Sequence, residues 1–78
     1  MPARNSKDFQ AVTEALGRIL DPKWDGRSSF SIQEAAEILG ISPWAAYRAA
    51  KSGDLPIVRM GKREIVPRVR LERLMTGE

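Results

Sequence analysis

Apolar residues recur at steps of three and four near the start of the chain, which is the spacing of an amphipathic helix. After a tail of residues 1–6, the pattern predicts a helix from Asp8 to Leu20 with one apolar face: Phe9, Val12, Leu16, Ile19 and Leu20. Asp21-Pro22 ends this helix, because the residue before a proline avoids the helical region. The apolar face either completes the core, which we favour because small domains need the buried area, or contacts another protein.

A polar connection over residues 23–29 is expected to lead to a second helix. Ser31, followed by Glu34 three residues later, is a capping box, in which each side chain bonds the other residue's backbone amide. The helix is expected to continue through Leu39, with four inward positions: Ile32, Ala35, Ala36 and Leu39. Gly40 suits the left-handed conformation that commonly ends a helix.

A third helix is expected to begin at once. Ser42-Pro43 supplies an N-cap and a first helical residue, and Gly53 follows the expected last residue, Ser52. Its inward positions are Ala46, Ala49 and Ala50. Two short helices joined by a glycine-containing turn are typical of a helix-turn-helix motif, although an ordinary corner between two helices has the same pattern.

Two β-prone runs, residues 57–60 and 63–66, come after this motif. They flank Gly61-Lys62, and a two-residue turn with glycine first predicts a type II′ hairpin. In this register Arg59 lies opposite Glu64 as a cross-strand charge pair.

A last helix is expected from Pro67 to about Met75. Its inward positions are Leu71, Leu74 and Met75, and its outer faces carry Arg68, Arg70 and Arg73. The predicted fold is therefore mainly α with a small β-hairpin, an α+β winged helix-turn-helix with an additional N-terminal helix. We expect residues 1–28 to hold the tail, helix and connection, and residues 29–78 to form the winged helix-turn-helix domain.

Composition narrows the class of function. The 78 residues include neither cysteine nor histidine, so no disulfide and no metal site is expected. No cluster of activating groups accompanies Tyr47, so we predict no catalytic residue, no enzyme activity and no cofactor. No apolar run approaches the roughly 18 residues of a membrane span, and no leader peptide is evident. These features fit a cytoplasmic protein that needs neither a membrane nor a small-molecule ligand.

Charge is distributed unevenly along the chain. Residues 44–73 hold eight Lys or Arg and three acidic residues, whereas the residues before them hold five basic and six acidic residues. A basic half of this kind indicates a polyanion partner, or else a solvated basic surface without a partner. Double-stranded DNA is the polyanion that a helix-turn-helix fits.

The third helix is the candidate recognition helix, and its outward positions are Trp44, Tyr47, Arg48 and Lys51. Arg48 is expected to pair with a guanine edge or to hold a phosphate, and Lys51 to hold a phosphate. The Ser42 hydroxyl and the first amides of the helix also suit a phosphate. Trp44 and Tyr47 are as well explained by packing as by contact with DNA.

The tip of the hairpin is the second candidate contact. Arg59, Lys62 and Arg63 lie at or beside the turn. A basic wing of this kind lies along the DNA backbone or enters the adjacent minor groove, although charged turns are also common at solvated hairpins.

Residues 29–75 resemble the excisionase family of winged helix-turn-helix domains, a relative of the DNA-binding part of MerR-type regulators. The matching residues are Ser31 to Ser42, Tyr47-Arg48, Gly53 to Pro56, Arg59 to Arg63, Pro67 and Leu71. The resemblance implies a recombination directionality factor, a phage protein that binds side by side at an attachment site, bends the DNA and helps an integrase to excise a prophage. By resemblance the contact positions are Tyr47, Arg48 and Lys51 on the recognition helix and Lys62 and Arg63 on the wing.

Two other functions stay open at this point. A small transcription regulator would use the same DNA-binding domain. A protein-interaction module would use the apolar face of the N-terminal helix and carry its basic surface incidentally.

Overall fold

A computed structural model describes the backbone of residues 6–77 and the side chains of residues 13–77. Its elements, in chain order, are α1 (Ser6–Ile19), the 3-10 helix η1 (Pro22–Trp24), β1 (Ser29–Ser31), α2 (Ile32–Leu39), α3 (Pro43–Ser52), β2 (Val58–Met60), β3 (Arg63–Pro67) and α4 (Arg68–Thr76). Helices thus dominate the described range, and a small antiparallel sheet accompanies them. The predicted α+β class and winged helix-turn-helix architecture are confirmed.

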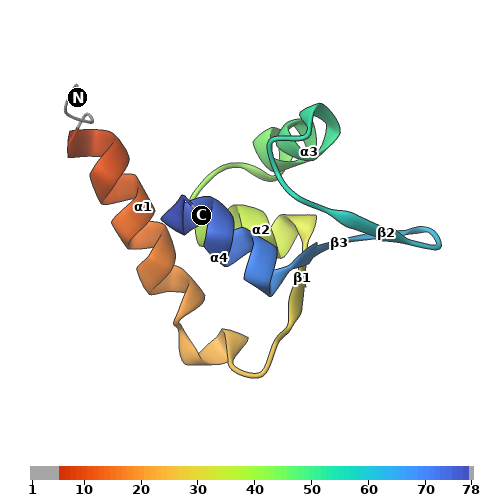
Figure 1. The fold of residues 1–78 in the computed structure, drawn as a ribbon, viewed down its shortest axis with the longest axis horizontal. Helices are drawn as coiled ribbons and strands as arrows, with labels where there is room; N and C mark the ends of the chain where they lie inside the picture. The colour runs from red at the N-terminus through yellow and green to blue at the C-terminus, as the bar shows by residue number, and fades with distance from the viewer. Residues whose placement is uncertain (1–5, 78) are drawn as a thin grey trace.

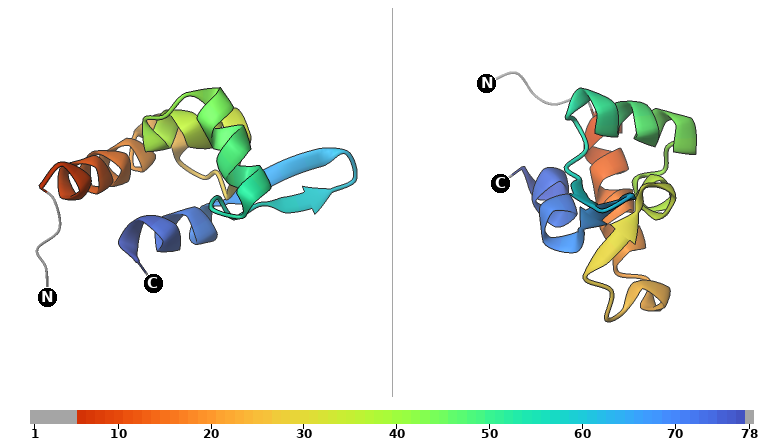
Figure 2. Two further views of the ribbon diagram at one scale, coloured as in Figure 1. Left: turned by 90° about the horizontal axis from the view of Figure 1, so that it is seen from above. Right: turned by 90° about the vertical axis from the view of Figure 1, so that its right-hand side faces the viewer.

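The helix α2 lies at the centre of the molecule and contacts α1, α3, β1 and β3. Figure 1 shows the hairpin of β2 and β3 extending away from the helices on the side opposite to α1. Seen from above in Figure 2, α1 and the hairpin point in opposite directions, and α3 crosses close to the base of the hairpin. The two elements predicted to meet DNA therefore lie on the same part of the molecule.

The predicted caps of α2 and α3 are confirmed. The Ser31 hydroxyl accepts a hydrogen bond from the Glu34 amide at 3.0 Å, and the Ser31 amide donates to the Glu34 carboxylate at 2.9 Å. The Ser42 hydroxyl accepts from the Ala45 amide at 3.1 Å. Both helices end at residues in the left-handed conformation, Gly40 (φ +75°) and Gly53 (φ +89°). Local hydrogen bonding thus sets the limits of the helix-turn-helix.

The hairpin has the predicted register, in which Arg59 lies opposite Glu64. Gly61, the first residue of the turn, has φ +64°. Lys62, the second, does not have a positive φ, because every described residue with a positive φ is a glycine. This is the φ pattern of a type II′ turn. The structure adds a strand that the sequence pattern did not predict. β1 pairs with β3, and the sheet order is β1-β3-β2.

The connection before α2 is less polar than predicted. Trp24 is only 5% exposed, and its ring meets that of Phe30 edge to face with 5.3 Å between the centroids. Phe30 pairs with Val66 across β1 and β3, and both side chains are buried. Trp24, in a segment expected to be solvated, therefore joins the core beside Phe30.

One core unites the N-terminal segment with the helix-turn-helix. Its largest fully buried side chains are Phe30, Ile19, Ile38, Leu55, Leu71 and Val66. Ala46 is fully buried, and Ala49 and Ala50 pack against this core as predicted. The side chains of Phe9 and Val12 lie outside the described residues.

Two inward positions were predicted wrongly. Leu20 is 70% exposed because α1 ends one residue earlier, at Ile19. Leu74 is 46% exposed because α4 buries only the stripe of Leu71 and Met75, four residues apart. On α2 Leu39 is half-buried and packs against the core, and Ile38, which the pattern did not include, is fully buried.

The prediction for Arg68, an outer face of the last helix, was also wrong. Its side chain is 20% exposed and donates to the carbonyl oxygens of Ile19 at 3.0 Å, Trp24 at 2.8 Å and Arg27 at 3.2 Å. It also forms an ion pair with Glu72 at 3.1 Å. The prediction failed because the helical period assigns a residue to a face of α4 but does not show which backbone carbonyl oxygens from distant segments pack against that face.

A second arginine holds α1 against the turn of the helix-turn-helix. The Arg18 Nε donates to the carbonyl oxygen of Ile38 at 2.7 Å, near the end of α2. Its guanidinium lies so close to Gly40 that a Cβ there would approach Nη2 to 2.7 Å. The turn therefore favours glycine for its φ, and the end of the Arg18 side chain would have to shift to admit a Cβ.

Replacing Arg68 by Met should lower the free energy of unfolding by about 2–3 kcal/mol, because carbonyl oxygens at the ends of three segments lose a charged donor. Urea denaturation measures this change. The matched control is Arg70→Met, an exposed site on the same helix, which should change the free energy of unfolding by less than about 0.5 kcal/mol. Equal effects of the two substitutions would contradict the structural role of Arg68.

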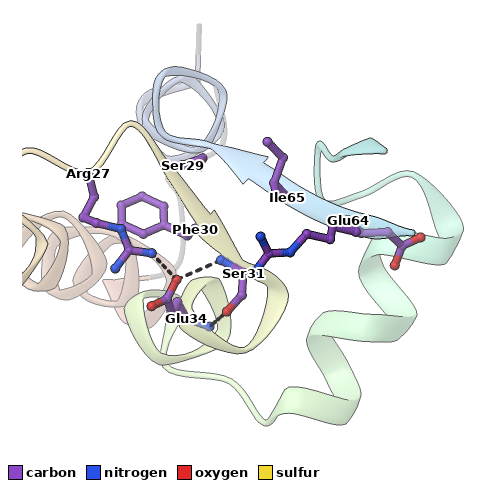
Figure 3. A pocket seen from close by; sticks show the side chains of 8 residues that line it. Arg27, Ser29, Phe30, Ser31, Glu34, Glu64 and Ile65 are labelled. Carbon is purple, nitrogen blue, oxygen red and sulfur yellow. Dashed lines mark hydrogen bonds and ion pairs between the residues drawn. The ribbon is translucent and has the colours of Figure 1, made fainter. Parts of the chain in front are cut away.

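Figure 3 shows the Glu34 carboxylate between the Arg27 guanidinium and the Ser31 amide. The hydrogen bond from Arg27 is the main cause that lowers the pKa of Glu34, and the Ser31 amide adds to it. A lowered folded-state pKa stabilises the fold above the ordinary carboxyl pKa, and this stabilisation is lost as the pH falls through the lowered value.

The variant Glu34→Gln should therefore be less stable than the parent at pH 7, by about 0.5–1 kcal/mol for a partly exposed ion pair. This difference should shrink towards zero as the pH falls below about 4. Denaturation of both proteins across this pH range measures it, and a difference independent of pH would contradict the assignment.

Candidate nucleic-acid interface

The outward face of α3 carries the four side chains predicted for it. Trp44 is 68% exposed and Tyr47 is 47% exposed, and Arg48 and Lys51 are exposed as well. The helix positions them because Ala46, on its opposite face, is fully buried. The small alanines on that face let α3 lie close to the core, so its outer side chains stand clear of the body.

Trp44 and Arg48 form a pair one helical turn apart. The guanidinium of Arg48 lies over the Trp44 ring at 4.7 Å from the ring centre. Such a cation–π contact favours one orientation of a long side chain on an exposed helix. Arg48 is thereby held near the start of α3, where Ser42 caps the helix.

The hairpin carries the other predicted contact residues. Arg59, Lys62 and Arg63 are all exposed. The side chain of Arg59 is oriented by a partner on the neighbouring strand, because its guanidinium donates to the Glu64 carboxylate at 2.8 Å. Within the described residues, no ion pair involves Lys62 or Arg63.

A hollow between α3 and the hairpin brings three predicted residues together. Tyr47 and Lys51 line it from α3, and Arg59 lines it from β2. The remaining lining residues are Ala50, Ile57 and Glu64. The hollow is the structural link between the recognition helix and the wing.

Arg63 lies at a different hollow, beside the start of α2. Its neighbours there include Arg27, Ser31 and Glu34. In Figure 3 the Glu64 carboxylate points away from the ion pair of Arg27 and Glu34. The predicted wing residues are thus divided between two sides of the hairpin.

Glu64 is the charged lining residue that sequence reasoning did not include among the site residues. Its predicted place opposite Arg59 was the available signal, since Arg59 was already a candidate contact. The sequence does not give the position of α3 relative to the hairpin, and only the packed structure shows that Arg59 and Glu64 face Tyr47 and Lys51.

The chemistry of this surface is that of a hydrogen-bond donor set. Arg48, Lys51, Arg59 and Lys62 offer cationic donors, and Tyr47 offers a hydroxyl. Such groups bind phosphate oxygens and the acceptor edges of bases. No helix within the described residues has the length and apolar character needed to cross a membrane.

A family model described as a helix-turn-helix domain matches residues 29–78. The matched range begins with β1 and includes α2, α3, the hairpin and α4, while α1 and η1 precede it. Neither a curated protein nor a solved structure matches the chain.

The two tryptophans allow a direct test of this exposed face. Replacing Trp44 by Ala should change the free energy of unfolding by less than about 0.5 kcal/mol, because most of the side chain is already in solvent. The control Trp24→Ala removes a buried aromatic and should cost about 3–5 kcal/mol. Chemical denaturation of both variants gives the two values, and a large loss for Trp44→Ala would mean that this residue packs rather than projects.

Proposed function

The chain belongs to the helix-turn-helix domain family, and from this premise we propose that it binds a defined site on double-stranded DNA through α3 and the hairpin. The family assignment supports double-stranded DNA as the partner and DNA association as the state in which the protein works. In the proposed complex α3 lies in the major groove, and the hairpin lies along the neighbouring backbone or in the minor groove.

The observation that carries this proposal is the hollow that joins the two elements. Lys51 from α3 and Arg59 from β2 line the same hollow, so both elements can meet one duplex at the same time. Arg48, oriented by Trp44, is assigned a guanine edge or a phosphate. Ser42 and Lys62 are assigned phosphates at the two ends of this surface.

We further propose that the protein acts as an excisionase-like directionality factor. The support is the resemblance of residues 29–75 to that family, together with the length of the recognition helix. Ten residues of α-helix span about 15 Å, so one copy reads only a short site. Several copies bound side by side would supply the specificity that one copy lacks. In this role they bend an attachment site and assist an integrase in excising a prophage.

The first test is a mobility-shift titration at several salt concentrations, with duplex fragments from the neighbourhood of the gene. Arg48→Ala and Lys62→Ala should each weaken binding, and each lost phosphate contact should reduce the slope of log K against log salt by about 0.9. The control Arg73→Ala removes an exposed arginine from α4 and should leave both quantities unchanged. Binding that is insensitive to the first two substitutions would contradict this interface.

A second test separates the directionality factor from a plain DNA binder. The proposal predicts a ladder of complexes with cooperative spacing and, on circularly permuted fragments, a mobility that depends on the position of the site. It also predicts that the protein stimulates excision by an integrase in a reconstituted assay. Independent binding to isolated sites without bending would overturn this part of the proposal and leave DNA binding intact.

A further inference from the structure

Glu64 is an acidic residue in the hollow where the proposed DNA-binding elements meet. The hollow is otherwise lined by Lys51, Arg59, Tyr47 and two apolar side chains. A carboxylate in this place repels phosphate, so it lowers the affinity for any duplex whatever its sequence. Because Glu64 weakens binding to DNA in general, we look for a role in which it favours one DNA sequence over others.

The geometry holds the carboxylate in one place. The Glu64 side chain is 32% exposed, whereas that of Arg59 is 72% exposed, so the acid lies deeper and the guanidinium lies outside it. One carboxylate oxygen accepts from one guanidinium nitrogen at 2.8 Å. Within the described residues neither side chain makes another hydrogen bond, so a second carboxylate oxygen and further guanidinium N–H groups remain available.

The pair therefore presents an acceptor and a set of donors side by side. A phosphate group has only acceptors and satisfies the guanidinium but not the carboxylate. In the minor groove the edge of a G·C base pair offers an amino donor beside a carbonyl acceptor, whereas an A·T pair shows acceptors only. In the major groove an A·T pair also offers an amino donor beside a carbonyl acceptor, so a carboxylate with a guanidinium distinguishes G·C from A·T only in the minor groove.

We propose that the Arg59–Glu64 pair contacts the minor-groove edge of a G·C base pair and that Glu64 is a specificity-determining residue of the DNA interface. The carboxylate accepts from the amino group of the base, and the guanidinium donates to the neighbouring acceptor. This inference rests on the proposed DNA binding and adds to it the class of ligand at this hollow. Lys51, on the other wall, holds the adjacent phosphate.

The test begins with selection of the preferred site of the parent protein from a random duplex library. Binding is then measured for every single base-pair change in that site. The parent should discriminate by about five- to hundredfold against replacement of one particular G·C pair by an A·T pair. Glu64→Gln should flatten the preference at that pair alone and should raise the affinity for random duplex, because it removes a negative charge.

Two further variants separate this role from simple charge neutralisation. Glu37→Gln removes the same charge from an exposed ion pair with Lys23, outside the hollow, and should leave every base preference unchanged. Arg59→Lys keeps the charge but loses the forked donor set, so it should weaken the preference at the same G·C pair without changing the salt dependence.

The results distinguish a failure of this inference from a failure of the proposed DNA binding. A base profile of Glu64→Gln identical to that of the parent at every G·C pair would overturn the inference while DNA binding stands. A parent protein that selects no duplex at all would instead overturn the proposed function. Thermal unfolding of each variant confirms that it is folded before its binding is compared.

Discussion

The hydrogen bonds of the Arg68 guanidinium connect the parts of this fold that lie farthest apart in sequence. The three carbonyl oxygens that it holds belong to the end of α1, to η1 and to the loop before β1. The backbone amide of Arg68 also donates to the carbonyl oxygen of Ser28 at 2.8 Å. This arrangement sets the start of β1 against the end of β3, and β1 in turn leads directly into the cap of α2. A single side chain thus links the N-terminal segment to the helix-turn-helix.

The same contacts support the surface that we propose to contact DNA. Phe30 of β1 fills the space beneath β3, so the hairpin rests on the core at its base while its tip remains free. Arg18 fixes the turn between α2 and α3 by bonding the end of α2. These contacts hold both ends of the motif, and the exposed face of α3 and the basic hairpin meet at the hollow that they share.

The features that the sequence predicted correctly are those set by neighbouring residues. Ser31 with Glu34, Ser42 with Pro43, and the Gly61 turn each act over four residues or fewer, so their patterns identify the caps and the hairpin register. The features that were missed depend on distant partners. β1 is three residues long and forms only because β3 lies beside it, and Arg68 is held by carbonyls more than forty residues away. The candidate site residues of α3 are exposed as expected, while the role proposed for Glu64 depends on packing that no local pattern contains.

We propose that α3 and the hairpin form one DNA-contacting surface. Adding a selected duplex to the isotope-labelled protein and recording the backbone amide NMR signals tests this surface residue by residue. The largest changes should fall on residues 42–52 and 58–64, with little change along α1. Changes centred on α1, or changes on α3 without any on the hairpin, would contradict the claim.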